Sequence, residues 1–136
     1  MELFTFKLLY VIFYLIIDIS YVLLSKPVYE GRIIKIQGSG FIDKPWVLLS
    51  AIASYLFLAI GWWILVAERI TKTTPFLETL RIIIPYALVI YGVFNTTLYV
   101  MFKEWNTAIF WRDIVWGVSS LTIITLFYQY LLGKLF

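Results

Sequence analysis

The amino-acid sequence predicts an all-α integral membrane protein, a bundle of four transmembrane helices with both termini on the same side of the bilayer. Of its 136 residues, 62% are hydrophobic and only 14% are charged, against roughly 25% charged in a soluble domain. The mean hydropathy is +0.93, too apolar for a small soluble globule, which buries only about two-thirds of its unfolded surface. We therefore expect one transmembrane domain over residues 1–136, with the lipid bilayer as its main partner.

Four apolar runs define the expected spans, at about residues 8–24, 46–67, 82–102 and 114–132. Each is close to the roughly 17–25 residues that a helix needs to cross the hydrocarbon core. They are too long for barrel strands, and lipid offers no partner to unpaired backbone groups, so we expect helices. The first run is the weakest because Asp18 interrupts it, although its many Leu, Ile, Val and Phe side chains offset the cost of that carboxylate.

The segments beside the spans carry turn signals. A first loop over residues 25–45 contains Gly38-Ser39-Gly40, which indicates flexibility, and residues 32–36, which fit either a helical turn or a short strand. Thr74 before Pro75 predicts the N-cap and first residue of the third helix. Pro85 predicts a mild bend near the start of that span.

The residue types that the sequence lacks exclude several kinds of site. It has no cysteine and no histidine, which excludes disulfides, thiolate and imidazole metal sites, cysteine nucleophiles and Ser-His-Asp triads. We therefore expect no cofactor and no metal. The net charge of +3 suits positive side chains at headgroup level better than a nucleic-acid surface, so no nucleic-acid partner is expected.

The polar residues of three spans are expected to meet at one depth. Asp18 and Asn95 lie about 9 and 10 Å from the ends of their spans, on the side opposite to the termini. Arg112 and Asp113 stand at the mouth of the fourth span on that same side, while the half nearer the termini is expected to be nearly pure hydrocarbon. The candidate site is a polar cluster formed by Asp18, Tyr21, Tyr91, Asn95, Arg112, Asp113 and Trp116.

Helical spacing places these residues on two stripes, which consist of Tyr10, Tyr14, Asp18, Tyr21 and Ser25 on the first span and Tyr91, Asn95 and Tyr99 on the third. One interpretation is that the stripes are inward faces whose polar groups hydrogen-bond across helices. The other is a polar pocket centred on Asp18, because an ionisable group inside a membrane is a functional-site hypothesis by default. In either case we expect Arg112 or a tyrosine hydroxyl to contact Asp18, since an unpaired buried carboxylate is costly.

Small residues predict where helices approach one another closely. Gly92 and Thr96 form a small-xxx-small pair on the third span, and Ser50 and Ser54 form one on the second. Gly117 serves the same purpose on the fourth span.

Several motifs stand along the chain in a recognisable order. Asp18 is followed by Lys26-Pro27-Val28-Tyr29, then by Tyr91 and Asn95, and Trp105 precedes Asp113-Ile114-Val115-Trp116-Gly117. This order resembles the uncharacterised integral-membrane family called domain of unknown function 2177, which has bacterial and large-DNA-virus members. The family pattern has Asp and Thr where this chain has Gly92 and Phe94, and a shorter link from Asn95 to Trp105. The resemblance implies the four-helix architecture and lends no activity.

Three functions remain open from the sequence. The first is a non-catalytic structural or interaction role, for example in the membrane of a virus particle, with other membrane or capsid-type proteins or further copies of the chain as partners. The second is a small transporter or channel subunit with a polar pocket around Asp18 and Asn95. The third is an enzyme acting on lipid with Asp18 and Asp113 as an acid–base pair, which the absence of His and Cys disfavours.

Overall fold

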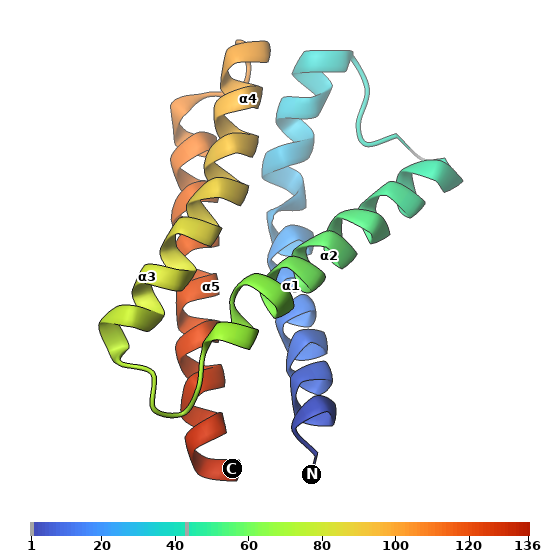
Figure 1. Ribbon diagram of the computed structural model, residues 1–136. Helices are drawn as coiled ribbons and strands as arrows, with labels where there is room; N and C mark the ends of the chain where they lie inside the picture. Colours follow the sequence, from blue (N-terminus) through green and yellow to red (C-terminus); the bar gives the residue numbers. More distant parts are fainter. Residues whose placement is uncertain (1, 43) are drawn as a thin grey trace.

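The fold consists of four helical rods (Figure 1). It is taken from a computed structural model that describes residues 2–42 and 44–136, and those residues contain no strand. The rods are α1 (Leu3–Gln37), α2 (Pro45–Leu65) with the 3₁₀ turn η1 (Ala67–Arg69), a third rod, and α5 (Thr107–Leu135). The third rod joins α3 (Phe76–Ala87), the π-helical turn η2 (Leu88–Gly92) and α4 (Val93–Met101). All four are long and apolar enough to cross a membrane, which confirms the predicted fold class.

The first helix is much longer than predicted. α1 continues through Pro27 to Gln37, so the loop predicted over residues 25–45 is wrong for most of its length, and residues 32–36 are helical. Gly38 ends the helix in the left-handed conformation, with φ of 78°, and its N–H donates to the Ile34 carbonyl at 2.8 Å. This glycine is therefore a C-cap rather than a mark of flexibility. At 1.5 Å per residue α1 is roughly 50 Å long, well beyond the roughly 30 Å hydrocarbon core.

The third rod begins one residue later than predicted and contains a π-helical turn that the sequence did not predict. Its first helical residue is Phe76, and Pro75 takes the N-cap position without a side-chain cap. The predicted N-cap role of Thr74 is wrong because its hydroxyl instead accepts the backbone N–H of Thr71 at 2.8 Å. Pro85 lies inside α3, and the π-helical turn η2 follows three residues later. A proline removes one backbone hydrogen bond, and a π-turn is one way in which a helix adjusts its register near such a defect.

An aromatic core fills the half of the bundle nearer the termini. The rings of Tyr10, Tyr14, Trp62 and Tyr128 are buried there, and Trp62 meets Tyr128 edge to face with ring centroids 5.1 Å apart. Polar groups are present as well, because Trp62 Nε1 donates to the hydroxyl of Thr125 at 3.0 Å. The prediction of a nearly pure hydrocarbon half is therefore wrong.

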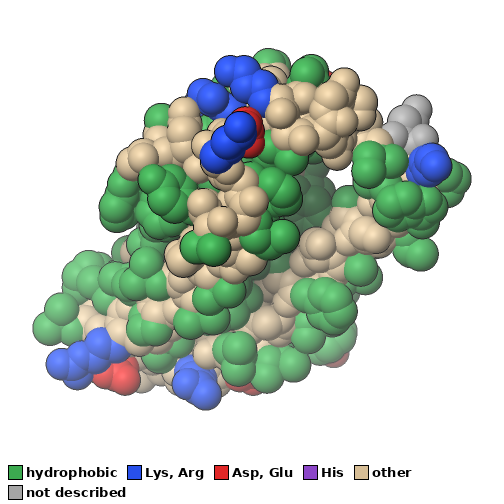
Figure 2. Space-filling view, turned by 90° about the horizontal axis from the view of Figure 1, so that it is seen from above, with side chains coloured by type: hydrophobic (Ala, Val, Ile, Leu, Met, Phe, Trp, Pro, Cys, Tyr) green, Lys and Arg blue, Asp and Glu red, His purple; other side chains and the backbone are tan. Residues whose placement is uncertain are grey.

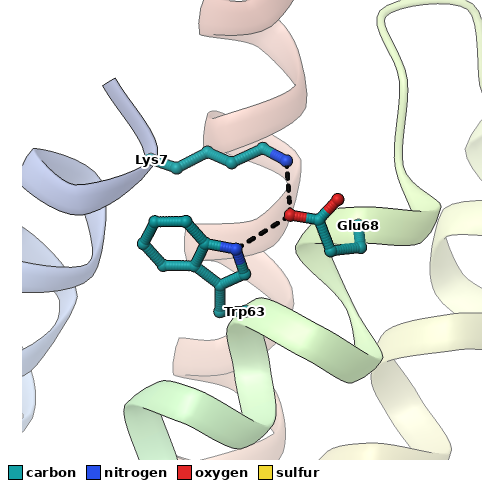
Figure 3. Close-up of polar contacts among 3 residues, drawn as sticks. All are labelled: Lys7, Trp63 and Glu68. Carbon is teal, nitrogen blue, oxygen red and sulfur yellow. Dashed lines mark hydrogen bonds and ion pairs between the residues drawn. The ribbon is translucent and has the colours of Figure 1, made fainter. Parts of the chain in front are cut away.

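Both termini lie at the same end of the bundle, which we call the near end (Figure 1). Glu68 of η1 accepts hydrogen bonds there from Lys7 Nζ at 2.7 Å and from Trp63 Nε1 at 2.8 Å (Figure 3). Lys72 donates to the backbone carbonyl of Phe136 at 2.9 Å. Because the Glu68 side chain is half exposed, the ion pair between Lys7 and Glu68 contributes at most about 1 kcal/mol to stability. Together, the two bonds to Glu68 join α1, the end of α2 and η1.

The second rod is attached to the others mainly through its C-terminal half. Of the α2 residues only Ala59 and Trp62 are buried. Tyr86 of α3 supports the same half, since its hydroxyl donates to the Leu58 carbonyl at 2.9 Å. From there the N-terminal half of α2 leans away from the other rods (Figure 1).

The third rod and α5 pack closely where Tyr91 lies against Gly117. A Cβ added at Gly117 would collide with the ring of Tyr91, whereas one added at Gly92 would meet no atom within 4 Å. The predicted close approach at Gly117 is therefore present, and the one predicted at Gly92 and Thr96 is not. Ser50 and Ser54 are exposed on α2 and contact no other rod through hydrogen bonds of the described residues.

These two glycines give a matched pair of variants. Gly117→Ala should displace the Tyr91 ring and lower the free energy of unfolding by about 1–3 kcal/mol. Gly92→Ala should be neutral or stabilise the helix by up to about 1 kcal/mol. Unfolding in mixed detergent micelles, followed by tryptophan fluorescence, measures both. Equal effects of the two variants would contradict this packing.

Candidate functional site

The candidate site lies at the end of the bundle opposite to the termini, which we call the far end. Three rods build it, namely α1, the third rod and α5, while α2 supplies none of its hydrogen-bonded residues. Two buried carboxylates form its centre, Asp18 with 7% of its surface exposed and Asp113 with 8%.

Asp18 of α1 is held by two donors from other rods. Its Oδ1 accepts the hydroxyl of Tyr91 at 3.2 Å and the indole N–H of Trp116 at 3.4 Å. The expected contact between Asp18 and a tyrosine hydroxyl is thus present. Trp116 is fixed by Tyr21, whose ring stacks on it with centroids 4.0 Å apart and an interplanar angle of 7°.

Asp113 of α5 is held by a second pair of donors. The hydroxyl of Tyr29 donates to Oδ1 at 2.8 Å, and the amide of Asn95 donates to Oδ2 at 2.5 Å. Asn95 is fully buried and uses its remaining groups as well. Its Nδ2 also donates to the Tyr91 carbonyl at 2.9 Å, and its Oδ1 accepts the indole N–H of Trp105 at 3.1 Å.

Tyr91 and Asn95 join the two carboxylates into one network. They stand one turn apart on the third rod, and together they reach Asp18 on α1 and Asp113 on α5. Every donor in this network is a neutral phenol, amide or indole. Inside a membrane such bonds replace the water that the carboxylates have lost, so the network fastens the far ends of three rods together.

Arg112 faces the outer side of the same end. Its guanidinium donates to the hydroxyl of Tyr21 at 3.4 Å and to that of Ser25 at 3.3 Å. It makes no contact with Asp18 among the described hydrogen bonds and ion pairs, so of the two contacts expected for Asp18 only the tyrosine is found. Neither Asp18 nor Asp113 has an ion-pair partner within the described residues.

The structure brings together all seven residues of the predicted cluster, although Arg112 joins them only through Tyr21. The stripe on α1 is inward as predicted, since Tyr10, Tyr14, Asp18 and Ser25 are buried. Of the predicted stripe on the third rod, Asn95 is buried and Tyr91 is partly buried. Tyr99, the third residue of that stripe, is half exposed.

Three site residues were not in the predicted cluster, namely Ser25, Tyr29 and Trp105. Ser25 stands on the predicted stripe, and Tyr29 and Trp105 belong to the motifs on which the family resemblance was based. The predicted loop over residues 25–45 hid the role of Tyr29, because a loop gives no helical face on which to place it.

Comparison with known protein families decides where the chain belongs. The model of a family described as "Predicted membrane protein (DUF2177)" matches residues 3–130, nearly the whole chain. The chain is a member of the DUF2177 family. It is thus a multi-pass integral membrane protein of an uncharacterised family. Comparison with curated proteins and with solved structures gives no significant match.

The departures of this DUF2177 member from the family pattern can now be placed. Gly92, which stands in place of an Asp, lies in η2 one turn before Asn95 and has open space beyond its Cα. Phe94, in place of Thr, meets the ring of Trp105 edge to face at 6.3 Å. The network around Asn95 is therefore complete without a carboxylate at position 92.

The network predicts a difference between two tyrosines at the same end. Tyr29→Phe removes a donor to the buried Asp113 and should lower the free energy of unfolding by about 1–2 kcal/mol. Tyr99→Phe removes a hydroxyl of a half-exposed residue, 3.4 Å from the hydroxyl of Thr107. This variant should change the free energy of unfolding by less than about 0.5 kcal/mol. Unfolding in detergent micelles provides the comparison, and a neutral Tyr29→Phe variant would show that Asp113 does not need this donor.

Proposed function

We propose that the protein has a non-catalytic interaction role in the membrane and associates with a second copy of itself through the N-terminal half of α2. One observation carries this proposal. From Pro45 to Phe57 no side chain is buried, and most are exposed. This half of the helix leans away from the bundle (Figure 1). Seen from above, hydrophobic side chains cover much of the outer surface (Figure 2), so the bundle offers apolar faces to lipid or to other helices.

The polar network supports a role without catalysis. Asp18 and Asp113 are the carboxylates that an acid–base mechanism would need, and each is buried with two neutral donors bound to it. Donors of this kind hold a carboxylate in place and join helices. Within the described residues no group of three or more acidic side chains is arranged to hold a metal ion.

The face that carries Ser50 and Ser54 is suited to a partner helix. The two side chains are small and one turn apart, and their hydroxyls donate to the carbonyls of Trp46 at 2.9 Å and of Ser50 at 3.0 Å on their own helix. The face is therefore shallow and its polar groups are satisfied, so another backbone can approach it closely. A second copy presents the same face, which gives a closed two-fold contact.

Single cysteines test this association, because the chain has none of its own. Ser50→Cys should form a disulfide-linked dimer when membranes are oxidised, because the two α2 faces meet there. Thr96→Cys, at an exposed position of α4, is the control and should stay monomeric. Equal cross-linking of both variants, or none at Ser50→Cys, would mean that lipid alone covers α2.

A larger side chain on the same face of α2 provides a second test of the association. Adding Ser54→Ile to the Ser50→Cys variant should lower the cross-linked fraction several-fold, because a branched side chain holds the helices apart. Ser119→Ile, the same change at an exposed position of α5, should leave the cross-linked fraction unchanged. A place in a virus-particle membrane or another large assembly would need a second contact face. A single cysteine links at most two chains, so an amine-reactive cross-linker would be needed to show products larger than a dimer.

Transport is the competing function, and the far-end geometry favours it less. A vestibule around Asp18 and Asn95 would leave these groups open to water, whereas both are buried in the hydrogen-bonded network. A cavity at this end is lined by Asp113 but not by Asp18 or Asn95. Transport would be favoured if the flux of a solute across proteoliposomes were lower with the Asp18→Asn variant than with the unaltered protein. An unchanged flux favours the interaction role.

A further inference from the structure

A cavity of about 680 Å³ lies between the far half of α1, α4 and the first turns of α5. Its size is within the range of small-molecule sites, about 300–1,000 Å³. The α1 side of the cavity is one helical face, on which Val22, Lys26, Tyr29 and Ile33 succeed each other at intervals of three or four residues. The cavity shares no residue with α2, so a ligand bound in it would not depend on self-association through that helix.

The inner wall of the cavity is aromatic. Tyr29 and Trp105 lie stacked there with ring centroids 6.1 Å apart, and Phe94 meets Trp105 edge to face. Phe102 also lines the cavity, and Phe41, which is 47% exposed, lines its open side. The faces of such rings attract organic cations.

A carboxylate stands among these rings. Asp113 lines the cavity with 8% of its surface exposed, and its donors Tyr29 and Asn95 are neutral. Arg112, the nearest cation in sequence, turns instead to Tyr21 and Ser25. A buried carboxylate without a cation favours a positively charged ligand.

A positive charge stands at the exposed part of the same cavity. Lys26 is exposed, with Nζ 6.0 Å from the centroid of Phe41, and it takes part in no ion pair of the described residues. Val22 and Leu23 line the cavity beside it and are 42% and 64% exposed. The cavity thus offers a negative charge inside, a positive charge outside and apolar side chains that face the lipid.

We propose that this cavity binds the headgroup of a zwitterionic, amine-headed membrane phospholipid. The ammonium group lies against the rings of Tyr29 and Trp105 and faces Asp113. The phosphate stays at Lys26, and the acyl chains run along Val22 and Leu23. This arrangement pairs each charge of the cavity with the opposite charge of the ligand, which an anionic lipid or a lipid without a charged headgroup cannot do.

The test is the lipid that the purified full-length protein retains. The protein is exposed to equal amounts of phosphatidylethanolamine, phosphatidylglycerol and diacylglycerol in detergent, and the retained lipids are counted by native mass spectrometry. Phosphatidylethanolamine should be enriched about fivefold or more over each of the others, the effect of one or two charged contacts. No enrichment, or enrichment of phosphatidylglycerol, would overturn the proposal.

Variants assign the enrichment to this cavity. Lys26→Gln removes an exposed charge with little effect on folding and should lower the enrichment several-fold, while Lys35→Gln, on the same helix but outside the cavity, should not. Asp113→Asn should abolish the preference for the amine head in protein that still unfolds cooperatively. Ile33→Trp fills the cavity and should reduce retention of all three lipids. An enrichment that survives both Lys26→Gln and Ile33→Trp would place the lipid elsewhere and refute the proposal.

Discussion

The structure depends on one constraint, namely that a buried carboxylate in a membrane protein must find its hydrogen bonds inside the chain. Asp18 and Asp113 meet this requirement with donors from rods other than their own. Because the donors come from α1, the third rod and α5, satisfying two side chains also fixes the relative positions of three helices. Asn95 is central, since it contacts Asp113, Trp105 and the backbone of Tyr91 at once.

The same constraint explains the unequal attachment of α2. The far-end network includes no residue of this helix, which is held instead at the near end by Trp62, by the Tyr86 contact and by Glu68. The two ends of the bundle therefore have different tasks. The near end packs aromatic rings from all four rods, while the far end joins three rods through polar groups and leaves the start of α2 and a cavity open to ligands or partners.

Much of this arrangement could be predicted from the sequence, because hydrophobic length fixes the spans and helical spacing fixes the buried stripe on α1. The similar depths of Asp18 and Asn95, the position of Asp113 at the mouth of the fourth span and the helical spacing indicated that these residues would meet. The remainder could not be predicted because it depends on tertiary contacts. Residues 25–45, with Gly38-Ser39-Gly40 among them, were expected to form a loop, yet Tyr29, which binds Asp113, lies on a helix that continues past Pro27. Likewise nothing in the spacing of Trp62 indicates its bond to Thr125 in a distant span.

The central claim is that Asn95 and Asp113 stabilise the fold through each other. A double-mutant cycle with Asn95→Ala, Asp113→Ala and the double variant, measured as free energies of unfolding in detergent micelles, tests it most directly. A coupling energy of at least about 1 kcal/mol is predicted, because the buried partners share one hydrogen bond in the absence of water. Effects that add to within about 0.5 kcal/mol would contradict the account.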